Sequence, residues 1–437
     1  MSDGNFHVLV AGGGIGGLCL AQALRGANIS VAVYERDDRR DARLDRYRLH
    51  INPAGSRSLH ACLSPQAWAH FLGTAGRTGG GFGFLSEQLQ TMVVVEDEIM
   101  YPPSTDPAEK WYPVDRKTLR EVLLTDLAGV VHFGKAFERY ESAPGGGVIA
   151  HFADGSRASG DLLVGCDGTG SRVRRQRVPE ASPVDAGARG IGMKLPLTAT
   201  TRAWLPTRLT RGENLIFAPD PFFLFTSVFD NGVPALPDTN GSRDGGGYLL
   251  CAFVVGQHVG PADLGSLEPA QLQQVVVDLT RRWHPDLRRV LAECDSDSPG
   301  CFPFVCTTPI PTWPAGNVTL LGDAVHAMPP TGGLGANTAL RDARLLAAHL
   351  GEVATGRIGL TEAIDAYQGA MRVYASTAVR SSLTTLRQGL ATNGAALTGM
   401  RTWLRLSGAV TPLRRVGFQD NWARHSRPQP WELTAGT

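Results

Sequence analysis

The sequence shows almost no bias of charge. Its 437 residues include 42 Lys or Arg and 41 Asp or Glu, so the formal net charge is only +1. The densest basic cluster runs from Arg172 to Arg177 and holds four arginines, which is too small for an electrostatic footprint on nucleic acid. We therefore expect no nucleic-acid partner.

Cysteine pairs and long apolar runs are also missing. The seven cysteines are scattered, and Cys301 and Cys306 lack the paired spacing of a zinc site, so we expect reduced thiols and no metal. No apolar run approaches the ~18 residues of a membrane span. Met1 to Asn5 is short and polar, unlike a secretory signal. These absences predict a cytoplasmic protein without stable membrane insertion.

Glycine, in contrast, is abundant and gathers near the start. An apolar run from His7 to Ala11 reads as a buried strand, and a glycine cluster follows it and opens a helical pattern. Gly12 permits a tight turn, Gly14 lets a pyrophosphate approach the backbone, and Gly17 lets the helix pack close to the strand. Glu35 ends a second predicted strand, where a carboxylate accepts hydrogen bonds from an adenosine ribose. The pattern predicts a dinucleotide site and does not separate FAD from NAD.

Two later segments carry further polar residues at expected strand ends. Asp167-Gly168-Thr169-Gly170 lies in mid-chain, and Gly322-Asp323-Ala324 follows the apolar run from Val318 to Leu321. Asp323 should therefore lie at the carboxyl edge of the sheet, where open α/β sheets bind ligands. Its alternative role is to cap the next helix, and the two roles are compatible.

A proline and glycine turn follows Asp323. Pro329 and Pro330 precede a run of glycines, and a helix is expected to begin near Ala336. The N-terminus of a helix presents free N–H groups and the positive end of its dipole. This turn therefore predicts a site for a ligand that carries or acquires negative charge.

The three segments together resemble those of a known family. The chain is similar to the single-component FAD-dependent aromatic hydroxylases, the flavin monooxygenases with the para-hydroxybenzoate hydroxylase fold, from about Val8 to Tyr374. Within them it is most similar to tetracycline-inactivating monooxygenases. The segments that carry this likeness are Val33 to Asp37, Asp115 to Arg120 and Tyr367 to Ala375.

The resemblance implies a set of FAD contacts. Asp323 would bind the ribityl hydroxyls, and the backbone of residues 335–337 would face the pyrimidine side of the flavin ring. Arg43 matches a position associated with the nicotinamide nucleotide, although residues 36–48 are rich in basic groups and could form a solvated face. The predicted cofactor-binding residues are Gly12, Gly14, Gly17, Glu35, Arg36, Arg43, Arg116, Asp167, Asp323, Pro330, Gly335, Ala336 and Asn337.

The resemblance also implies the chemistry. NAD(P)H and O2 would serve as co-substrates, and a flavin C4a-hydroperoxide would hydroxylate an aromatic or polyketide-like molecule. No side chain is predicted to be catalytic, and His326 is interpreted as structural. Two alternatives share the fold: a flavin reductase that saturates C=C bonds, and a non-catalytic FAD-fold binding protein.

The expected architecture is an α/β chain with a Rossmann-like FAD domain and an inserted sheet. Aromatic, β-prone runs in the insertion suggest a substrate-binding surface, for which the candidates are Phe217, Phe223, Phe225 and Phe253, each of which could instead be ordinary core. A helical pattern begins at Leu360 and turns irregular past Pro412. The predicted domains are 1–75, 111–179 and 300–350 for FAD, 76–110 and 180–299 for the substrate sheet, and 351–437 for a C-terminal helical segment.

Overall fold

In the computed structural model, the protein is built around a parallel sheet whose strands come from segments far apart in the chain. The structure describes residues 6–39, 48–230, 232 and 247–428. Neighbouring strands in this five-stranded sheet all run parallel. Its order is β17 (Val318–Leu320), β11 (Leu162–Gly165), β1 (His7–Ala11), β2 (Ser30–Tyr34) and β7 (Val131–His132). The central strands are apolar runs buried on both faces, as parallel strands covered by helices require.

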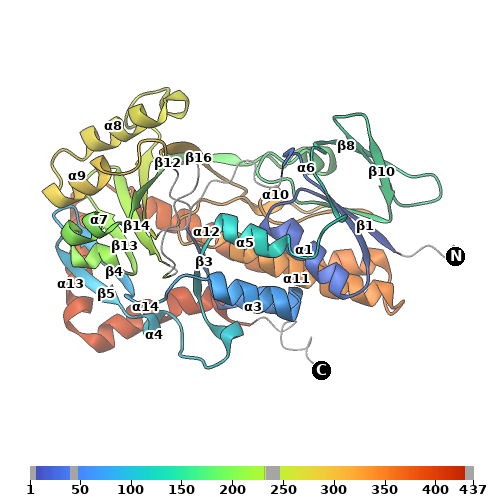
Figure 1. Ribbon diagram of the computed structural model, residues 1–437, viewed down its shortest axis with the longest axis horizontal. Coiled ribbons are helices and arrows are strands. Elements are labelled where there is room, and N and C mark those ends of the chain that lie inside the picture. Colours follow the sequence, from blue (N-terminus) through green and yellow to red (C-terminus); the bar gives the residue numbers. More distant parts are fainter. Residues whose placement is uncertain (1–5, 40–47, 231, 233–246, 429–437) are drawn as a thin grey trace.

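Helices cover this sheet and bring distant segments together. Figure 1 shows α1 (Ile15–Gly26) beside α11 (Gly335–Ala354) and the long α12 (Leu360–Gly389). The helix α2 (Pro53–Cys62) packs on α11 and begins with an Asn52 cap and a proline in its first turn. The remaining helices of this part are α3 (Pro65–Thr74), α5 (Arg116–Leu123), α6 (Arg172–Arg177) and α10 (Asp323–His326).

Two small sheets complete the part of the molecule that holds the glycine motifs. A three-stranded sheet has the order β10 (Arg157–Gly160), β9 (Val148–Phe152) and β8 (Phe137–Ser142). A two-stranded sheet pairs β3 (Arg48–Ile51) with β6 (Tyr112–Asp115). In the chain, β3 precedes α2, and β6 precedes α5.

The second large sheet has seven strands and lies at the other end of the molecule (Figure 1). The helices α8 (Pro269–Leu279) and α9 (Pro285–Ala292) cover its outer face. Its other face packs against the C-terminal helices α13 (Gly394–Ala409) and α14 (Thr411–Ser426) and the end of α12. Its order is β16 (Gly300–Cys306), β12 (Val184–Pro196), β15 (Tyr248–Gly256), β14 (Phe222–Phe229), β13 (Glu213–Phe217), β4 (Phe82–Ser86) and β5 (Thr91–Val95). The short helix α7 (Ala199–Trp204) connects β12 to β13, and α4 (Asp97–Met100) follows β5 and precedes β6.

The predicted fold class is confirmed, with two local corrections. The domain boundary expected before residue 300 is misplaced for one strand, because β16 pairs with β12 in the seven-stranded sheet. The irregular structure expected past Pro412 is a helix instead. Pro412 is the second residue of α14, a position where its missing N–H breaks no helical hydrogen bond. None of the described helices combines the length and hydropathy needed to cross a bilayer.

Candidate cofactor and substrate site

The first glycine turn is shaped by contacts that only glycine allows. Gly12 has a φ of +114°, and a Cβ there would lie 2.3 Å from the Cys166 carbonyl oxygen. A Cβ on Gly17 would lie 2.2 Å from the Gly12 carbonyl oxygen. A Cβ on Gly14 would meet nothing within 4 Å among the described residues, and no side chain of that part of the chain caps α1. The turn therefore offers open backbone at a helix N-terminus, which fits a pyrophosphate.

Glu35 lies at the end of β2 and ties the glycine turn to it. Its Oε2 accepts a hydrogen bond from the Gly13 N–H at 2.7 Å, and its Oε1 accepts one from the Asp37 N–H at 3.0 Å. Each carboxylate oxygen can accept a further bond, so its predicted ribose contact stays a prediction. Arg36 is exposed beside it, and Arg43 lies outside the described residues.

The Asp-Gly motif joins the other two segments. Asp167 Oδ2 accepts a hydrogen bond from the Arg172 N–H at 2.7 Å, whereas Oδ1 is buried and meets no donor among the described residues. Arg174 donates to the carbonyl oxygens of Thr169 and Ala324, both at 2.9 Å, so it links this motif to the Gly-Asp motif. A buried acceptor without a partner is the feature expected where a ligand donates a hydrogen bond.

Asp323 begins α10 at the carboxyl end of β17, as predicted from its place after that strand. Its side chain is exposed at the surface. The protein around it still removes water from the carboxyl, and this desolvation raises the pKa of Asp323 against the lowering effects of His326 and Arg116. A Cβ on Gly335 would lie 3.9 Å from Asp323 Oδ1. Asp323 is therefore accessible to a ligand, and its contact with the ribityl hydroxyls stays a prediction.

The helix α11 begins at Gly335 without a side-chain cap among the described residues. Ala336 is partly exposed there, and Pro330 is exposed in the preceding turn. Asn337 has a second role that sequence reasoning missed. Its Nδ2 donates to the carbonyl oxygens of His50 and Gly333, and its Oδ1 accepts from the Asn52 N–H, so its side chain fastens α11 to β3. Its backbone N–H remains in the first turn of the helix, where the flavin contact is predicted.

Two further residues of the site were not predicted. Asp342, on α11, accepts hydrogen bonds from the Gly322 N–H at 2.9 Å and the Tyr374 hydroxyl at 2.6 Å, and it binds the fully buried His326. This pairing supports the structural interpretation of His326. Arg120 Nε donates to the Gly13 carbonyl oxygen at 3.3 Å. It belongs to the Asp115 to Arg120 segment, so the sequence held a signal for it, whereas Asp342 lies in no motif.

The predicted substrate residues divide between the two faces of the seven-stranded sheet. Phe217, Phe223 and Phe225 share the face toward the C-terminal helices, together with Phe82 and Phe84. We call these five side chains the aromatic face. Phe253 does not join them: it is fully buried on the opposite face, under α8 and α9. Side chains alternate along a strand, so the register of β15 turns Phe253 away from the other three.

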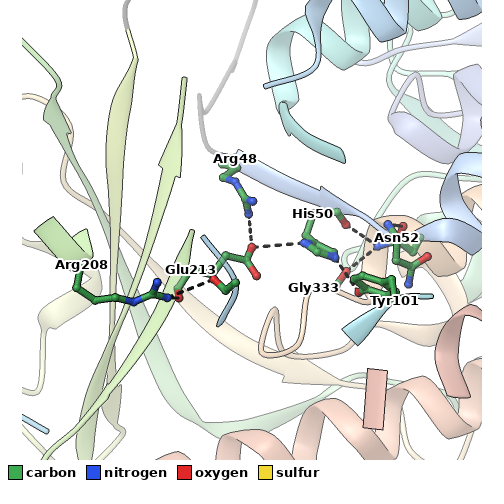
Figure 2. Close-up of polar contacts among 9 residues, drawn as sticks. Arg48, His50, Asn52, Tyr101, Arg208, Glu213 and Gly333 are labelled. Carbon is green, nitrogen blue, oxygen red and sulfur yellow. Dashed lines mark hydrogen bonds and ion pairs between the residues drawn. The ribbon is translucent and has the colours of Figure 1, made fainter. Parts of the chain in front are cut away.

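A buried polar cluster lies where the aromatic face meets β3 (Figure 2). Arg48 and His50 of β3 both contact Glu213 of β13, and His50 Nε2 forms a hydrogen bond of 2.8 Å with the Tyr101 hydroxyl. We call these four residues the junction cluster. No sequence motif predicted it, because its members come from three segments that lie 51 or more residues apart in the chain.

The glycine turn, the two acidic motifs and the uncapped α11 together fit FAD. Two family models match the chain: an NAD(P)-binding Rossmann-like domain over residues 10–69 and an FAD binding domain over residues 306–382. A protein from Photorhabdus luminescens described as an FAD-containing monooxygenase has a solved structure that is 32% identical. That match covers 89% of this chain and all of the other, with a TM-score of 0.79. The chain belongs to the FAD-dependent monooxygenase family. Its cofactor is FAD.

Two other relatives show how widely the fold is used. A dual O-methyltransferase/FAD-dependent monooxygenase from Cercospora beticola is 31% identical over 84% of this chain and 44% of its own length. The chain thus spans less than half the length of this curated relative. A solved tetracycline destructase is 15% identical, with a TM-score of 0.63, over 97% of this chain and 99% of its own. At that identity the likeness shows the shared fold, which is the fold predicted from the sequence.

Proposed function

We propose that this monooxygenase-family chain uses NAD(P)H and O2 to hydroxylate an aromatic or polyketide-like small molecule. The observation that carries the proposal is the occurrence in one chain of the predicted FAD contacts, which we call the FAD cradle, and of the aromatic face. The FAD cradle consists of residues 12–17, Asp167, Asp323 and residues 335–337. On their face toward the C-terminal helices, β4, β13 and β14 carry five phenylalanines and a single charged residue, Glu213. Glu213 contacts His50, whose carbonyl oxygen accepts a hydrogen bond from Asn337 of the cradle. Such a surface favours a flat apolar ring with one polar edge.

The protein's own groups would bind and orient rather than react. When bound, FAD supplies the transfer of electrons from NAD(P)H to O2 and of one oxygen atom to the substrate. The uncapped N-terminus of α11 favours negative charge beside it through its N–H groups and dipole. Asp323 would accept hydrogen bonds from hydroxyl groups of the cofactor, and the aromatic face would exclude water from the reacting atoms.

The curated fungal relative guides the choice of test compounds. Its name combines monooxygenase with O-methyltransferase. An O-methyltransferase acts on hydroxyl groups, which are what a hydroxylase places on a ring. Polyhydroxylated polycyclic aromatics therefore belong in the panel, beside simple phenols and tetracyclines.

The experiment begins with the purified chain. We expect a yellow protein whose FAD is released entirely by acid precipitation, because the glycine segments hold no His or Cys suited to attach the ring. NADH and NADPH oxidation in air is then measured with oxygen uptake across the panel, with product identified by mass. A product with one added oxygen atom supports the proposal.

Anaerobic reactions separate the alternatives. A saturated product that forms equally well without O2 would contradict the proposal and favour the reductase. A chain that binds FAD but oxidises neither NADH nor NADPH, with or without the panel compounds, would favour the binding protein.

A further inference from the structure

The junction cluster joins the two large parts of the molecule through a single acid. Glu213 is the only charged residue in β4, β13 and β14, and its side chain is 8% exposed. It belongs to the substrate sheet, whereas both of its cationic or ionisable partners, Arg48 and His50, belong to β3. The contact therefore forms a charged link between the aromatic face and β3.

The link is a true ion pair. The Arg48 side chain is 4% exposed. Burial alone would raise the pKa of Glu213, but Arg48 and His50 outweigh it and lower that pKa to about 2. A carboxylate taken out of water keeps its charge only when a partner is fixed at short range. Arg208 holds the backbone of the same residue, since its guanidinium donates to the Glu213 carbonyl oxygen at 2.9 Å (Figure 2).

Tyr101 fixes the orientation of His50. Burial, together with Glu213 and Asp97, raises the pKa of Tyr101 well above 10, so its hydroxyl keeps its proton and can donate it to His50 Nε2. On the other side of the ring, His50 Nδ1 faces Glu213 Oε1 at 3.4 Å. Trp111 stacks on the same ring, with centroids 5.0 Å apart and an interplanar angle of 16°.

The backbone of His50 continues the link to the segment from Pro330 to Asn337, where flavin contacts are predicted. We call this segment the flavin-binding turn. Its carbonyl oxygen accepts a hydrogen bond of 2.7 Å from Asn337 Nδ2, and the same amide donates to the Gly333 carbonyl oxygen at 2.8 Å. A Cβ on Gly333 would lie 3.5 Å from the His50 Cβ. Three residues, Glu213, His50 and Asn337, thus connect the substrate sheet to the N-terminus of α11.

We propose that Glu213 is a positioning residue, which sets the aromatic face against the flavin-binding turn through Arg48 and His50. The inference rests on the proposed function, because it assigns the junction cluster a role in closing the proposed monooxygenase site. An ion pair with fixed hydrogen bonds is directional, whereas apolar contacts are not, so the pair restricts sliding of the sheet over the cofactor more than the phenylalanines do. It acts together with the hydrogen bond of 3.0 Å from the Tyr248 hydroxyl of β15 to Asp115 of β6. A shifted sheet admits water to the flavin and reduces the coupling of NAD(P)H oxidation to product.

Three variants of the full-length FAD-loaded protein test this role. Glu213→Gln removes the charge but keeps the shape. Arg48→Met with Glu213→Leu removes both charges, which protects folding because no buried charge is left unpaired. Glu87→Gln is the matched control: Glu87 pairs with Arg401 at 2.6 Å with side chains 17% and 19% exposed, joining the same sheet to α13 rather than to β3.

Two quantities are measured on each variant at matched FAD content. The first is quenching of flavin fluorescence by iodide, which reports solvent access and needs no turnover. The second is the H2O2 formed per NAD(P)H consumed with a substrate from the panel. We expect both to rise about twofold or more in Glu213→Gln and in the double variant, and to stay unchanged in Glu87→Gln.

The outcomes separate this inference from the proposed function. A double variant that folds, binds FAD and matches the unmodified protein in iodide quenching would overturn the positioning role. An equal rise of both quantities in Glu87→Gln would overturn it as well, because the loss of any ion pair of the sheet would then expose the flavin to solvent. If the unmodified protein consumes no NAD(P)H, the proposed function fails, and the quenching comparison still decides the role of Glu213.

Discussion

In the FAD cradle, backbone atoms set the shape. Gly12 and Gly17 leave room for carbonyl oxygens a little over 2 Å from where a Cβ would be, and the helix N-termini of α1 and α11 present N–H groups rather than side chains. In the aromatic face, side chains set the shape, and neighbouring rings lie 5.0 to 6.2 Å apart at varied angles. Gly12 and Gly17 of the first region tolerate no added atom, whereas the second region can be repacked with other apolar groups. Under the proposed function, backbone atoms would recognise the fixed cofactor and side chains would accommodate a variable substrate.

The largest expected effect contrasts two glycines of the same turn. Gly12→Ala places a Cβ in contact with the Cys166 carbonyl oxygen at a φ of +114°, so we expect a loss of several kcal/mol or failure to fold. Gly14→Ala meets open space, so stability should hold while FAD affinity falls, because the methyl group blocks a phosphate. Thermal unfolding of the apoprotein and FAD titration measure the two effects. Equal stability losses would contradict the contrast.

The next contrast uses one substitution on opposite faces of the sheet. Phe253→Ala should cost about 3 to 5 kcal/mol of unfolding free energy, because it leaves a cavity under α8 and α9. Phe225→Ala, on the partly exposed aromatic face, should cost less but raise the H2O2 formed per NAD(P)H more than it slows anaerobic flavin reduction. Denaturant unfolding and coupling assays on both variants provide the check. If NAD(P)H oxidation stays tightly coupled to product formation in Phe225→Ala, this residue does not belong to the substrate surface.

A substitution at Asp323 tests the FAD cradle without changing the packed core. Asp323→Ala should keep the fold and lose FAD affinity by about ten- to a hundredfold, since a hydrogen bond to a charged group contributes about 1.5 to 3 kcal/mol. Equilibrium dialysis of FAD measures this loss, with Asp323→Asn as the isosteric control. Unchanged FAD affinity in the Ala variant, at matched fold, would exclude Asp323 from the site.

The smallest expected effect is the pH dependence contributed by Glu213. Its folded-state pKa, about 2, lies below the ordinary value of 4.5, so its contribution to stability is present above pH 4.5 and is lost as pH falls toward 2. The Arg48→Met, Glu213→Leu variant should therefore lose less stability over that range than the unmodified protein does. Urea unfolding at pH 6, 4.5 and 3 measures the two slopes. Parallel slopes would mean that the pair does not contribute to acid unfolding.

The sequence determined the cradle because its constraints are local. A tight turn after a strand demands glycine at fixed spacing, and an acid directly after a parallel strand lies at the sheet's carboxyl edge; both rules act within a few residues. The places of Gly12, Gly17 and Asp323 in the fold, together with the fold class, followed from such rules. The resemblance carried by these same segments then indicated the family and its cofactor.

Only the tertiary structure decided the rest, because it depends on which distant segments meet. Strand register turned Phe253 away from Phe225, and the pairing of β16 with β12 moved a domain boundary. Asn337 could be predicted at a helix start, but its bonds to β3 reach across more than 280 residues. Glu213 appears in the sequence as one acid before an apolar run. Only the tertiary structure brings its carboxylate into contact with Arg48 and His50 of β3.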